Sequence, residues 1–277
     1  MNRPKRAAGS PAAIRAPHDF LPDKDPLVRL PPEFKAWDRL ASDLPKLLTT
    51  TRIRSELAVL PKFPLAQLKT EPQLERAMMV LSYLGHAYVW GEAVPAAQLP
   101  AALAVPWHAV AKKVGRPPVL SYPSYALYNW KRMDPRRPIA LGNIVLLQNF
   151  LAGIDEEWFI LIHVDIEAKA GSAIAALKPA QQAALDGDAG ALLEQLQIVS
   201  TALSAMYDTL SRMPENCDPY IYYNRVRPYI HGWKNNPALP KGLVYEGVKE
   251  YGGKPQKFAG ETGAQSSIVP SLDAVLG

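Results

Sequence analysis

Several residue types and patterns are scarce in this chain of 277 residues, and each scarcity excludes a class of protein. The single cysteine, Cys217, excludes an internal disulfide and a cysteine-based zinc site, and it fits a reducing compartment. The longest strongly apolar run, residues 158–162, is far too short to span a bilayer. The N-terminus is basic and proline-rich, with no apolar segment behind it, so no secretory signal is predicted. Together these features predict a cytoplasmic protein with no membrane partner.

Excess charge of one sign is also small. Lys and Arg number 31 against 26 Asp and Glu, which gives a net charge of +5, and much of the excess lies in the first sixteen residues. No predicted element carries a basic stripe, so no nucleic-acid partner is expected. At 48% hydrophobic and 21% charged residues, the chain has enough apolar material for a sizeable core, which excludes a predominantly disordered protein.

The sequence lacks the usual signatures of several enzyme classes. Its five histidines form no H-x-x-x-H pair, so a protein-ligated zinc or di-iron centre has no support. It contains no G-x-S-x-G, no Walker-type G-x-x-x-x-G-K and no G-x-G-x-x-G. A hydrolase or a nucleotide-binding protein is therefore disfavoured.

Proline, by contrast, is abundant: the 27 prolines are nearly double the usual share of about 5%. They are dispersed along the chain and predict many short elements. Residues 1–32 are expected to form an extended arm, and the pattern favours helices over 33–60 and 72–91, followed by a proline-broken stretch over 95–120.

The pattern changes near residue 150, where we predict a domain boundary. An acidic triplet at 155–157 suits the first turn of a helix that continues from Trp158 to Leu177. A second long helix is expected over 179–213, with a break at Gly187, and Asp218-Pro219 caps another. After residue 232 the chain is rich in Gly and Pro. The predicted division is an arm (1–32), a first domain (33–150) and a helical second domain (151–277).

Three stretches carry candidate chemistry. Phe159, His163 and Glu167 are four residues apart, so they project from nearly one helix face. The segment by itself favours a buried histidine whose partner is a backbone carbonyl.

The second stretch, 222–227, places two tyrosines before Arg227. An arginine beside aromatic rings can hold a carboxylate while the rings stack on a planar substrate. A surface ion pair is the simpler interpretation. The third, 260–267, is a loop of small and hydroxyl-bearing residues, which a linker explains nearly as well.

Longer motifs show a specific resemblance. Ser121-Tyr122 and the run from Leu127 to Pro135 are followed by Gly232-Trp-Lys-Asn-Asn-Pro, Gly242-Leu-Val-Tyr-Glu-Gly and Gly263-Ala-Gln-Ser-Ser. With Pro61 and Val105-Pro106-Trp107, these motifs resemble the indoleamine 2,3-dioxygenase family in order and spacing. The resemblance covers nearly the whole chain from about residue 25.

That resemblance implies a haem b (iron) enzyme that inserts both atoms of O₂ across the indole C2–C3 bond of tryptophan. The product would be N-formylkynurenine, in the first step of the kynurenine pathway, with tryptophan or a related indoleamine and O₂ as partners. The implied fold is mainly α, with a small mixed N-terminal domain packed on an all-helical haem domain. Two alternatives stay open: a related indole-modifying haem protein, such as the branch of pyrrolnitrin synthesis, and a haem-free truncated relative that only binds indoles.

The resemblance also implies roles for individual residues. His163, the catalytic residue, would lie with Phe159 on the distal helix and hydrogen-bond the indole N–H, as in tryptophan 2,3-dioxygenases. Arg227 would hold the substrate carboxylate. The remaining implied substrate contacts are Tyr122, Tyr125 and Ala126 in the indole pocket, Tyr222 and Tyr223 where the family commonly has phenylalanines, and Thr262 and Gly263. The loop Gly260, Glu261, Thr262, Gly263 and Ala264 would contact a haem propionate and close over the substrate ammonium.

In the family, the proximal haem histidine lies well downstream of the Gly-Ala-Gln-Ser-Ser motif. No histidine follows His231 in this sequence, so we expect these residues to form the distal part of the haem domain and to supply no metal ligand. On that basis Phe159, Ile162 and Ile166 are expected to expose an apolar face. The expected results are weak haem binding, no tryptophan oxidation and self-association of the isolated chain.

Overall fold

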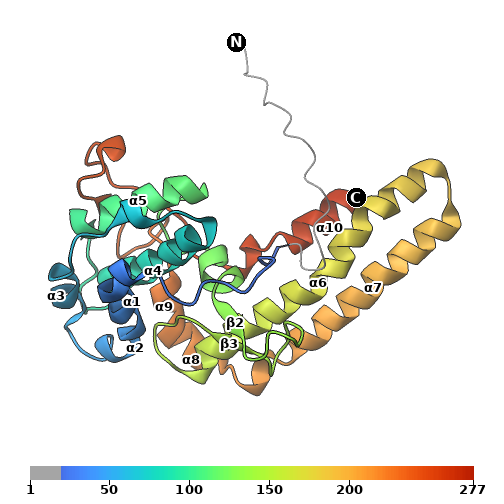
Figure 1. Ribbon diagram of the computed structural model, residues 1–277, viewed down its shortest axis with the longest axis horizontal. Helices are drawn as coiled ribbons and strands as arrows, with labels where there is room; N and C mark the ends of the chain where they lie inside the picture. Colours follow the sequence, from blue (N-terminus) through green and yellow to red (C-terminus); the bar gives the residue numbers. More distant parts are fainter. Residues whose placement is uncertain (1–19) are drawn as a thin grey trace, which may run out of the picture.

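The fold is mainly helical, as predicted. The computed structural model describes residues 20–277, so most of the expected N-terminal arm lies outside the described residues. Figure 1 shows a lobe of shorter helices from which one long helical hairpin, α6 and α7, extends. The helices are α1 (Lys35–Ser42), α2 (Leu44–Leu47), α3 (Ile53–Ala58), α4 (Glu71–Trp90), α5 (Ala101–Val114), α6 (Ile154–Asp186), α7 (Ala189–Ser211), α8 (Pro219–Ile221), α9 (Arg227–Ile230) and α10 (Ile268–Leu276).

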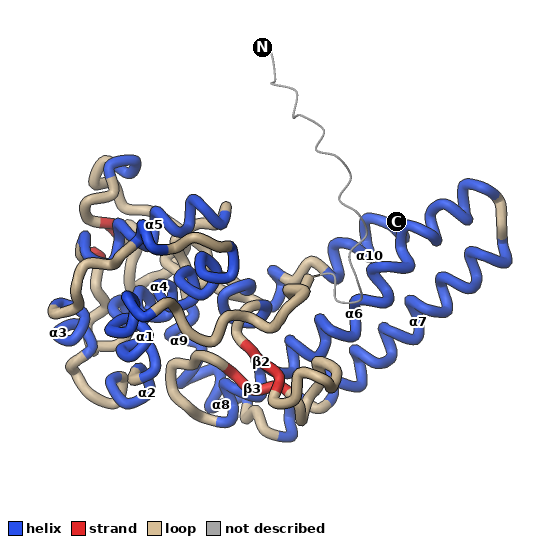
Figure 2. Tube along the Cα trace, in the orientation of Figure 1, coloured by secondary structure: helices blue, strands red, loops and turns tan. Residues whose placement is uncertain are grey.

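Strands are short and form two separate pairs, seen in red in Figure 2. β1 (Gln98–Leu99) pairs in parallel with β4 (Val244–Tyr245), with Gln98 opposite Val244. β2 (Trp130–Arg132) pairs antiparallel with β3 (Ile144–Leu146), with Trp130 opposite Leu146. Two π-helical turns, η3 (Pro123–Leu127) and η5 (Tyr222–Val226), connect longer elements. Short 3₁₀ turns occupy Pro32–Phe34, Leu65–Gln67, Met213–Glu215, Lys249–Tyr251 and Gly263–Gln265.

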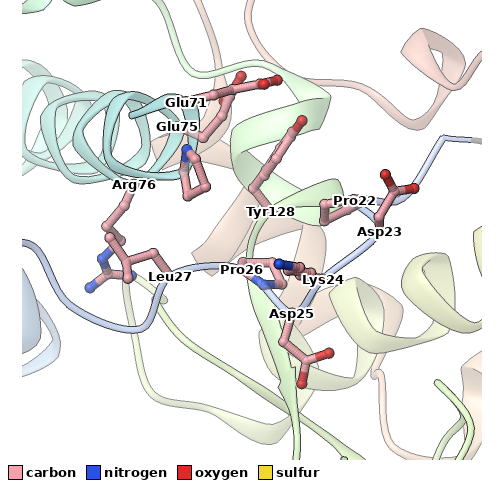
Figure 3. A pocket seen from close by; sticks show the side chains of 11 residues that line it. Pro22, Asp23, Lys24, Asp25, Pro26, Leu27, Glu71, Glu75, Arg76 and Tyr128 are labelled. Carbon is pink, nitrogen blue, oxygen red and sulfur yellow. The ribbon is translucent and has the colours of Figure 1, made fainter. Parts of the chain in front are cut away.

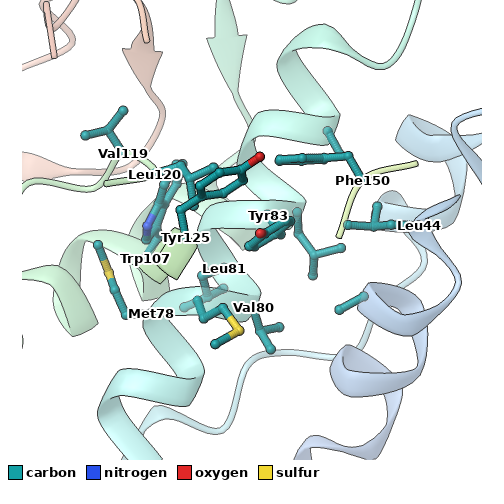
Figure 4. Packing of buried hydrophobic residues seen from close by; sticks show 14 of the residues in the cluster. Leu44, Met78, Val80, Leu81, Tyr83, Trp107, Val119, Leu120, Tyr125 and Phe150 are labelled. Carbon is teal, nitrogen blue, oxygen red and sulfur yellow. The ribbon is translucent and has the colours of Figure 1, made fainter. Parts of the chain in front are cut away.

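Helix α4 is the central helix of the lobe and confirms the helix predicted over 72–91. It begins with a capping box in which Gln73 accepts a hydrogen bond from the backbone of Thr70 at 3.2 Å, and Gly91 follows its last residue. Most of its side chains are buried on all sides, so the helix is held by packing rather than by an amphipathic face. In Figure 4, Tyr83 of α4 packs beside Tyr125 and Phe150, with ring centroids 4.5 Å apart for Tyr83 and Phe150.

Other predicted bounds are wrong for identifiable reasons. Residues 33–60 form three short helices. Pro45, in the first turn of α2, has no backbone N–H and therefore cannot continue the hydrogen-bond pattern of α1. The stretch 95–120 contains α5, a helix that continues through Pro106. Helix α6 likewise runs through Pro179. It ends at Gly187, which adopts φ 69°, so the predicted break at Gly187 is confirmed. α8 begins as predicted, with the Asp218 side chain accepting from Ile221 N at 2.9 Å. α10, for which no helix was predicted, lies in the Gly- and Pro-rich stretch after residue 232.

Two hydrophobic clusters stabilise the fold. The larger contains buried residues from Leu21 to Val248 and includes Ile160 and Val164 of α6, so it crosses residue 150; the predicted domain division stays a prediction. The smaller joins α6 and α7 to α10 through Ala173, Met206 and Leu272, among others.

The expectation of an exposed apolar face on α6 is wrong. Ile162 is 0% exposed, and Phe159 and Ile166 pack against the clusters. Helix α7, by contrast, carries a group of exposed large apolar side chains: Leu193, Leu196, Ile198, Leu203, Tyr207 and Leu210. Among the helices of residues 20–277, none is long and apolar enough to cross a membrane.

Gly85 shows how tightly α4 and α5 pack, and it provides a stability test. A β-carbon at Gly85 would lie 2.2 Å from the ring of Trp107, which is fully buried. In an exposed helix, Gly→Ala stabilises by about 1 kcal/mol. At Gly85 we expect the opposite: Gly85→Ala lowers the free energy of unfolding by about 1–3 kcal/mol, because the core is overpacked.

Urea unfolding measures this effect. Gly190→Ala in α7 is the matched control, since a β-carbon there meets its nearest neighbour, Asp188, at 3.4 Å. Equal stability changes for the two variants would contradict the packing argument.

Candidate functional site

One face of α6 carries the residues that the helical spacing selected. The ring of Phe159 lies 4.5 Å from that of His163, and the ring of Tyr122 approaches His163 at 6.0 Å, edge to face. Glu167, one turn further, is 1% exposed. The face is therefore mostly aromatic and ends in a buried carboxyl group.

The hydrogen bonding of His163 defines what its ring can do. Nδ1 lies 2.8 Å from the carbonyl oxygen of Phe159, so the imidazole donates its Nδ1 proton there, and Nε2 keeps a lone pair. Burial lowers the pKa of His163, so the ring is neutral at pH 7. The carbonyl partner expected from the segment alone is present, and it leaves Nε2 able to accept a hydrogen bond.

Glu167 links the π-turn η3 to the loop 260–267. Its Oε1 accepts hydrogen bonds from the hydroxyl of Tyr122 at 2.8 Å and from that of Ser266 at 2.7 Å. The backbone N–H of Tyr122 also donates to Oε1 of Gln265 at 2.8 Å. Burial raises the pKa of Glu167, and the two hydroxyl donors partly offset that rise. Three hydrogen bonds therefore hold the loop against Tyr122.

The two π-helical turns supply the opposite aromatic side chains. Tyr222 stacks on Phe159 with ring centroids 4.0 Å apart, and its hydroxyl lies 3.4 Å from that of Tyr125. Both tyrosines are buried, and burial raises the pKa of each phenol, so both stay protonated at neutral pH. π-turns are rare and concentrate at functional sites, and here each one presents a buried tyrosine to the same cluster.

The loop 260–267 lies directly over His163. A β-carbon at Gly263 would be 3.0 Å from Nε2 of His163, so a larger residue there would crowd the imidazole. The loop begins where Gly260 crosses Gly232; a β-carbon on Gly260 would lie 2.2 Å from the backbone nitrogen of Gly232. The backbone N–H of Glu261 donates to the carbonyl of Ile230 at 3.2 Å. Neither Gly260 nor Gly232 can therefore carry a side chain where the two backbones cross.

The remaining predicted residues are divided between a neighbouring surface, the core and the loop. Arg227 and Tyr223 are exposed, with the guanidinium 6.0 Å from the tyrosine ring. They line a cavity of about 350 Å³ together with Trp90 and His231. Ala126 is buried in the large core, whereas Thr262 and Ala264 are exposed on the loop. The structure therefore brings Phe159, His163, Tyr122, Tyr125, Tyr222, Glu261 and Gly263 together, and it places Arg227 and Tyr223 on the adjoining surface.

Residues 12–277 match the sequence profile of indoleamine 2,3-dioxygenase. The chain belongs to the indoleamine 2,3-dioxygenase family. It is 36% identical over 254 residues to "Indoleamine 2,3-dioxygenase 1" of Rattus norvegicus, which covers 91% of this chain and 62% of the rat protein. It is 35% identical over 260 residues to "Indoleamine 2,3-dioxygenase 2" of Homo sapiens, covering 93% of this chain and 63% of the human protein.

A more distant organism gives the same result. The chain is 32% identical over 275 residues to "Indoleamine 2,3-dioxygenase" of Saccharomyces cerevisiae, covering 94% of this chain and 59% of the yeast protein. The chain thus spans about three fifths of the length of the curated relatives it matches.

Sequence reasoning missed part of the site in this indoleamine dioxygenase family member. Glu167 was noticed by its spacing, but its role as the acceptor for Tyr122 and Ser266 was not, because the two contacts span 45 and 99 residues of sequence. Gln265 was also missed, although its side chain joins Tyr122 to the loop by donating from Nε2 to the carbonyl of Gly260 at 3.0 Å. A carboxyl group inside the otherwise apolar run of α6 is the signal that could have indicated Glu167; Gln265 is exposed in a polar loop and carries no such signal.

A separate cavity of about 230 Å³ lies at the start of α4, away from this cluster. Figure 3 shows its lining by the segment 22–27, by Glu71, Glu75 and Arg76 of α4, and by Tyr128. Within residues 20–277 there is no group of three or more His, Cys, Asp or Glu side chains arranged to hold a metal ion.

Proposed function

We propose that this chain forms the substrate side of a cytoplasmic haem dioxygenase that opens the indole ring of tryptophan to N-formylkynurenine, at the entry to the kynurenine pathway. The observation that carries the proposal is the neutral imidazole of His163, whose Nε2 has a free lone pair and lies among Phe159, Tyr122 and the loop 260–267. An indole presents one N–H donor on a flat apolar ring, which matches one acceptor among aromatic side chains.

The residues present fit one wall of a haem b site. Phe159 supplies an apolar ring, the neutral His163 adds no charge, and Gly263 lets the loop approach closely. Phe159 and His163 would form the distal wall, and the backbone of 260–264 would contact the propionates. When bound, haem would supply the iron at which O₂ reacts, while the protein orients the indole and excludes water.

Isotope labelling tests the proposed reaction. Haem-loaded protein, supplied with a downstream segment that carries a proximal histidine, is incubated under a reductant with L-tryptophan and ¹⁸O₂, and the product is analysed by mass spectrometry. We expect N-formylkynurenine that carries two labelled oxygen atoms. A product with one labelled oxygen, or a modified indole with an intact ring, would instead support the related indole-modifying haem protein; indole binding without haem would support the haem-free relative.

His163→Ser tests the role of the imidazole. We expect the haem spectrum to be unchanged, because His163 is proposed to contact the indole and not the iron. Binding of tryptophan should weaken by about 5- to 20-fold, the usual value of one hydrogen bond in a desolvated site. Binding of 1-methyltryptophan, which has no indole N–H, should change much less.

His108→Ser is the matched control, because His108 lies at a distance from the cluster and packs on Tyr251. Loss of the haem spectrum in His163→Ser alone would identify His163 as an axial ligand and reverse the distal assignment.

A further inference from the structure

Helix α7 carries two rows of apolar side chains, and only one of them is covered. The first row, which includes Val199, Ala202 and Met206, is buried in the smaller hydrophobic cluster. The second row lies one position further along the helix and is 37% to 69% exposed. We call it the α7 seam; its members are Leu193, Leu196, Leu203, Tyr207 and Leu210. A row of this kind marks a surface for interaction.

The α7 seam has the spacing at which one helix packs lengthwise on another. Positions 193, 196, 200, 203, 207 and 210 are separated alternately by three and four residues, and Ser200 is the polar member of the series. Two helices that pack in this way repeat their contacts every 3.5 residues on average. The seam is about 26 Å long, at a rise of about 1.5 Å per residue. Its geometry therefore fits a helix of about five turns.

A groove of about 540 Å³ continues the α7 seam near the tip of the hairpin. It is lined by Leu196 of the seam, by Ala184 and Leu185 of α6, and by Val275 and Leu276 of α10, among others. Figure 1 shows α10 lying beside α6 along the hairpin. Interfaces gain most from large side chains that fill such pockets, so the groove provides an anchor point for a partner helix.

The charge around the α7 seam indicates the chemistry of the partner. Residues 179–211 contain four acidic residues and no Lys, Arg or His, although the whole chain has a net charge of +5. Glu194 and Asp208 directly follow Leu193 and Tyr207, so they flank the seam on the side away from the buried row. Neither forms an ion pair with a Lys or Arg of residues 20–277.

These acidic flanks distinguish between the possible occupants. A second copy of the chain would bring acidic side chains together, and an anionic lipid surface would repel them. A helix that carries Lys or Arg beside its own apolar row is attracted instead, because the charges are complementary.

We propose that the α7 seam binds a basic amphipathic helix of a partner protein. The partner helix lies lengthwise along α7, with its apolar residues on the seam and a large side chain in the groove near the tip of the hairpin. Its Lys or Arg side chains face Glu194 and Asp208. None of the residues assigned to the indole site lies on α7, so this inference does not depend on the proposed function.

Fluorescence anisotropy with a designed peptide tests the proposal on the whole chain. The probe is a labelled three-heptad peptide with Leu at the apolar positions, Lys at the flanking positions and Ala elsewhere. A matched peptide has Glu in place of each Lys. We expect the Lys peptide to bind about 10-fold more tightly than the Glu peptide, and the difference to shrink as salt is added.

Substitutions in the α7 seam give the second comparison. Leu196→Gln combined with Leu203→Gln should weaken binding of the Lys peptide by about 10- to 100-fold, because two apolar contacts are lost. Ile198→Gln is the matched control: Ile198 is also on α7 and as exposed as Leu196, at 37%, but lies outside the seam. Glu194→Gln combined with Asp208→Asn leaves the apolar row intact and should remove the preference for the Lys peptide.

Several results would overturn the proposal. They are binding of neither peptide, equal affinity for both, or a loss of affinity in Ile198→Gln as large as that in the leucine pair. Analytical ultracentrifugation of the protein alone and flotation with phosphatidylserine vesicles test the other occupants. A dimer or a vesicle complex that the leucine substitutions abolish would assign the α7 seam to a second copy or to a lipid surface.

Discussion

His86→Ala is expected to lower the free energy of unfolding by about 3–5 kcal/mol, the largest effect we predict for a residue outside the ligand site. The His86 ring is 0% exposed and uses both nitrogens: Nδ1 donates to the carbonyl of Tyr229 at 2.7 Å, and Nε2 accepts from the backbone N–H of Leu120 at 2.9 Å. Removing it leaves two buried backbone groups unpaired and a cavity against Trp233.

Urea unfolding of His86→Ala and of His108→Ala, a less buried histidine, measures the difference. The effect should also reach the site, because His86 ties α4 to the chain just before η3 and to α9, which carry Tyr122 and Arg227. If both alanine variants lose similar stability, the two hydrogen bonds of His86 contribute little.

The same residue predicts a pH dependence. Burial lowers the pKa of His86 from 6.5 to about 4. Below pH 6.5 the histidine of the unfolded chain is protonated, whereas that of the folded chain stays neutral until about pH 4. Protonation therefore favours the unfolded state, and the stability that His86 contributes is complete above pH 6.5 and decreases as the pH falls toward 4. Removing the histidine should thus destabilise the protein more at pH 7 than at pH 4.5, as measured by urea unfolding at the two pH values.

The buried carboxyl groups of Glu156 and Glu261 change the stability with pH in the opposite direction to His86. Burial raises their pKa values to about 7 and about 8. The folded state holds these protons more tightly than the unfolded chain, so their contribution falls as the pH rises from 4.5 through these values. His86→Ala is compared with the parent protein at each pH, so this shared background cancels.

Arg227→Ala is expected to raise KM for tryptophan by about 10- to 100-fold in haem-loaded protein, while KM for tryptamine changes little. The guanidinium is the group proposed to hold the substrate carboxylate, and tryptamine has no carboxylate to hold. The arginine is exposed and stacks on Tyr223, so its removal should cost the fold little.

Arg225→Ala, two residues earlier and also exposed, is the matched control. Steady-state kinetics with both substrates on both variants give the comparison. An equal rise in KM for tryptophan and tryptamine would show that Arg227 supports the site without contacting the carboxylate.

Local rules predicted the parts of the molecule in which nearby residues decide the structure. The apolar periodicity over 72–91 placed α4, and the four-residue spacing placed Phe159 and His163 on one face of α6. Those rules do not weigh packing against a single unfavourable residue. The long helices therefore continue through Pro106 and Pro179, where tertiary contacts offset the loss of one hydrogen bond.

Long-range contacts could not be predicted in the same way. Neighbouring residues of a helical turn point in different directions, so Tyr222 and Tyr223 do not share a face. Tyr222 is the one that is buried, stacked on Phe159 of α6, and Tyr223 is exposed. The predicted aromatic pair is therefore divided between two faces. The acceptor role of Glu167 depends in turn on the fold that brings Tyr122 and Ser266 to it.

The loop over His163 is fixed at both ends, and this limits how a ligand can enter. Its start is bound to Ile230, and its end continues directly into α10, whose Ile268 and Leu272 are buried against α6 and α7. The middle of the loop is held by side chains: Gln265 accepts from the backbone of Tyr122, and Ser266 donates to Glu167. Movement of the loop away from His163 must break these hydrogen bonds, so a few side-chain contacts, which rearrange faster than whole domains move, determine how firmly the loop covers the imidazole.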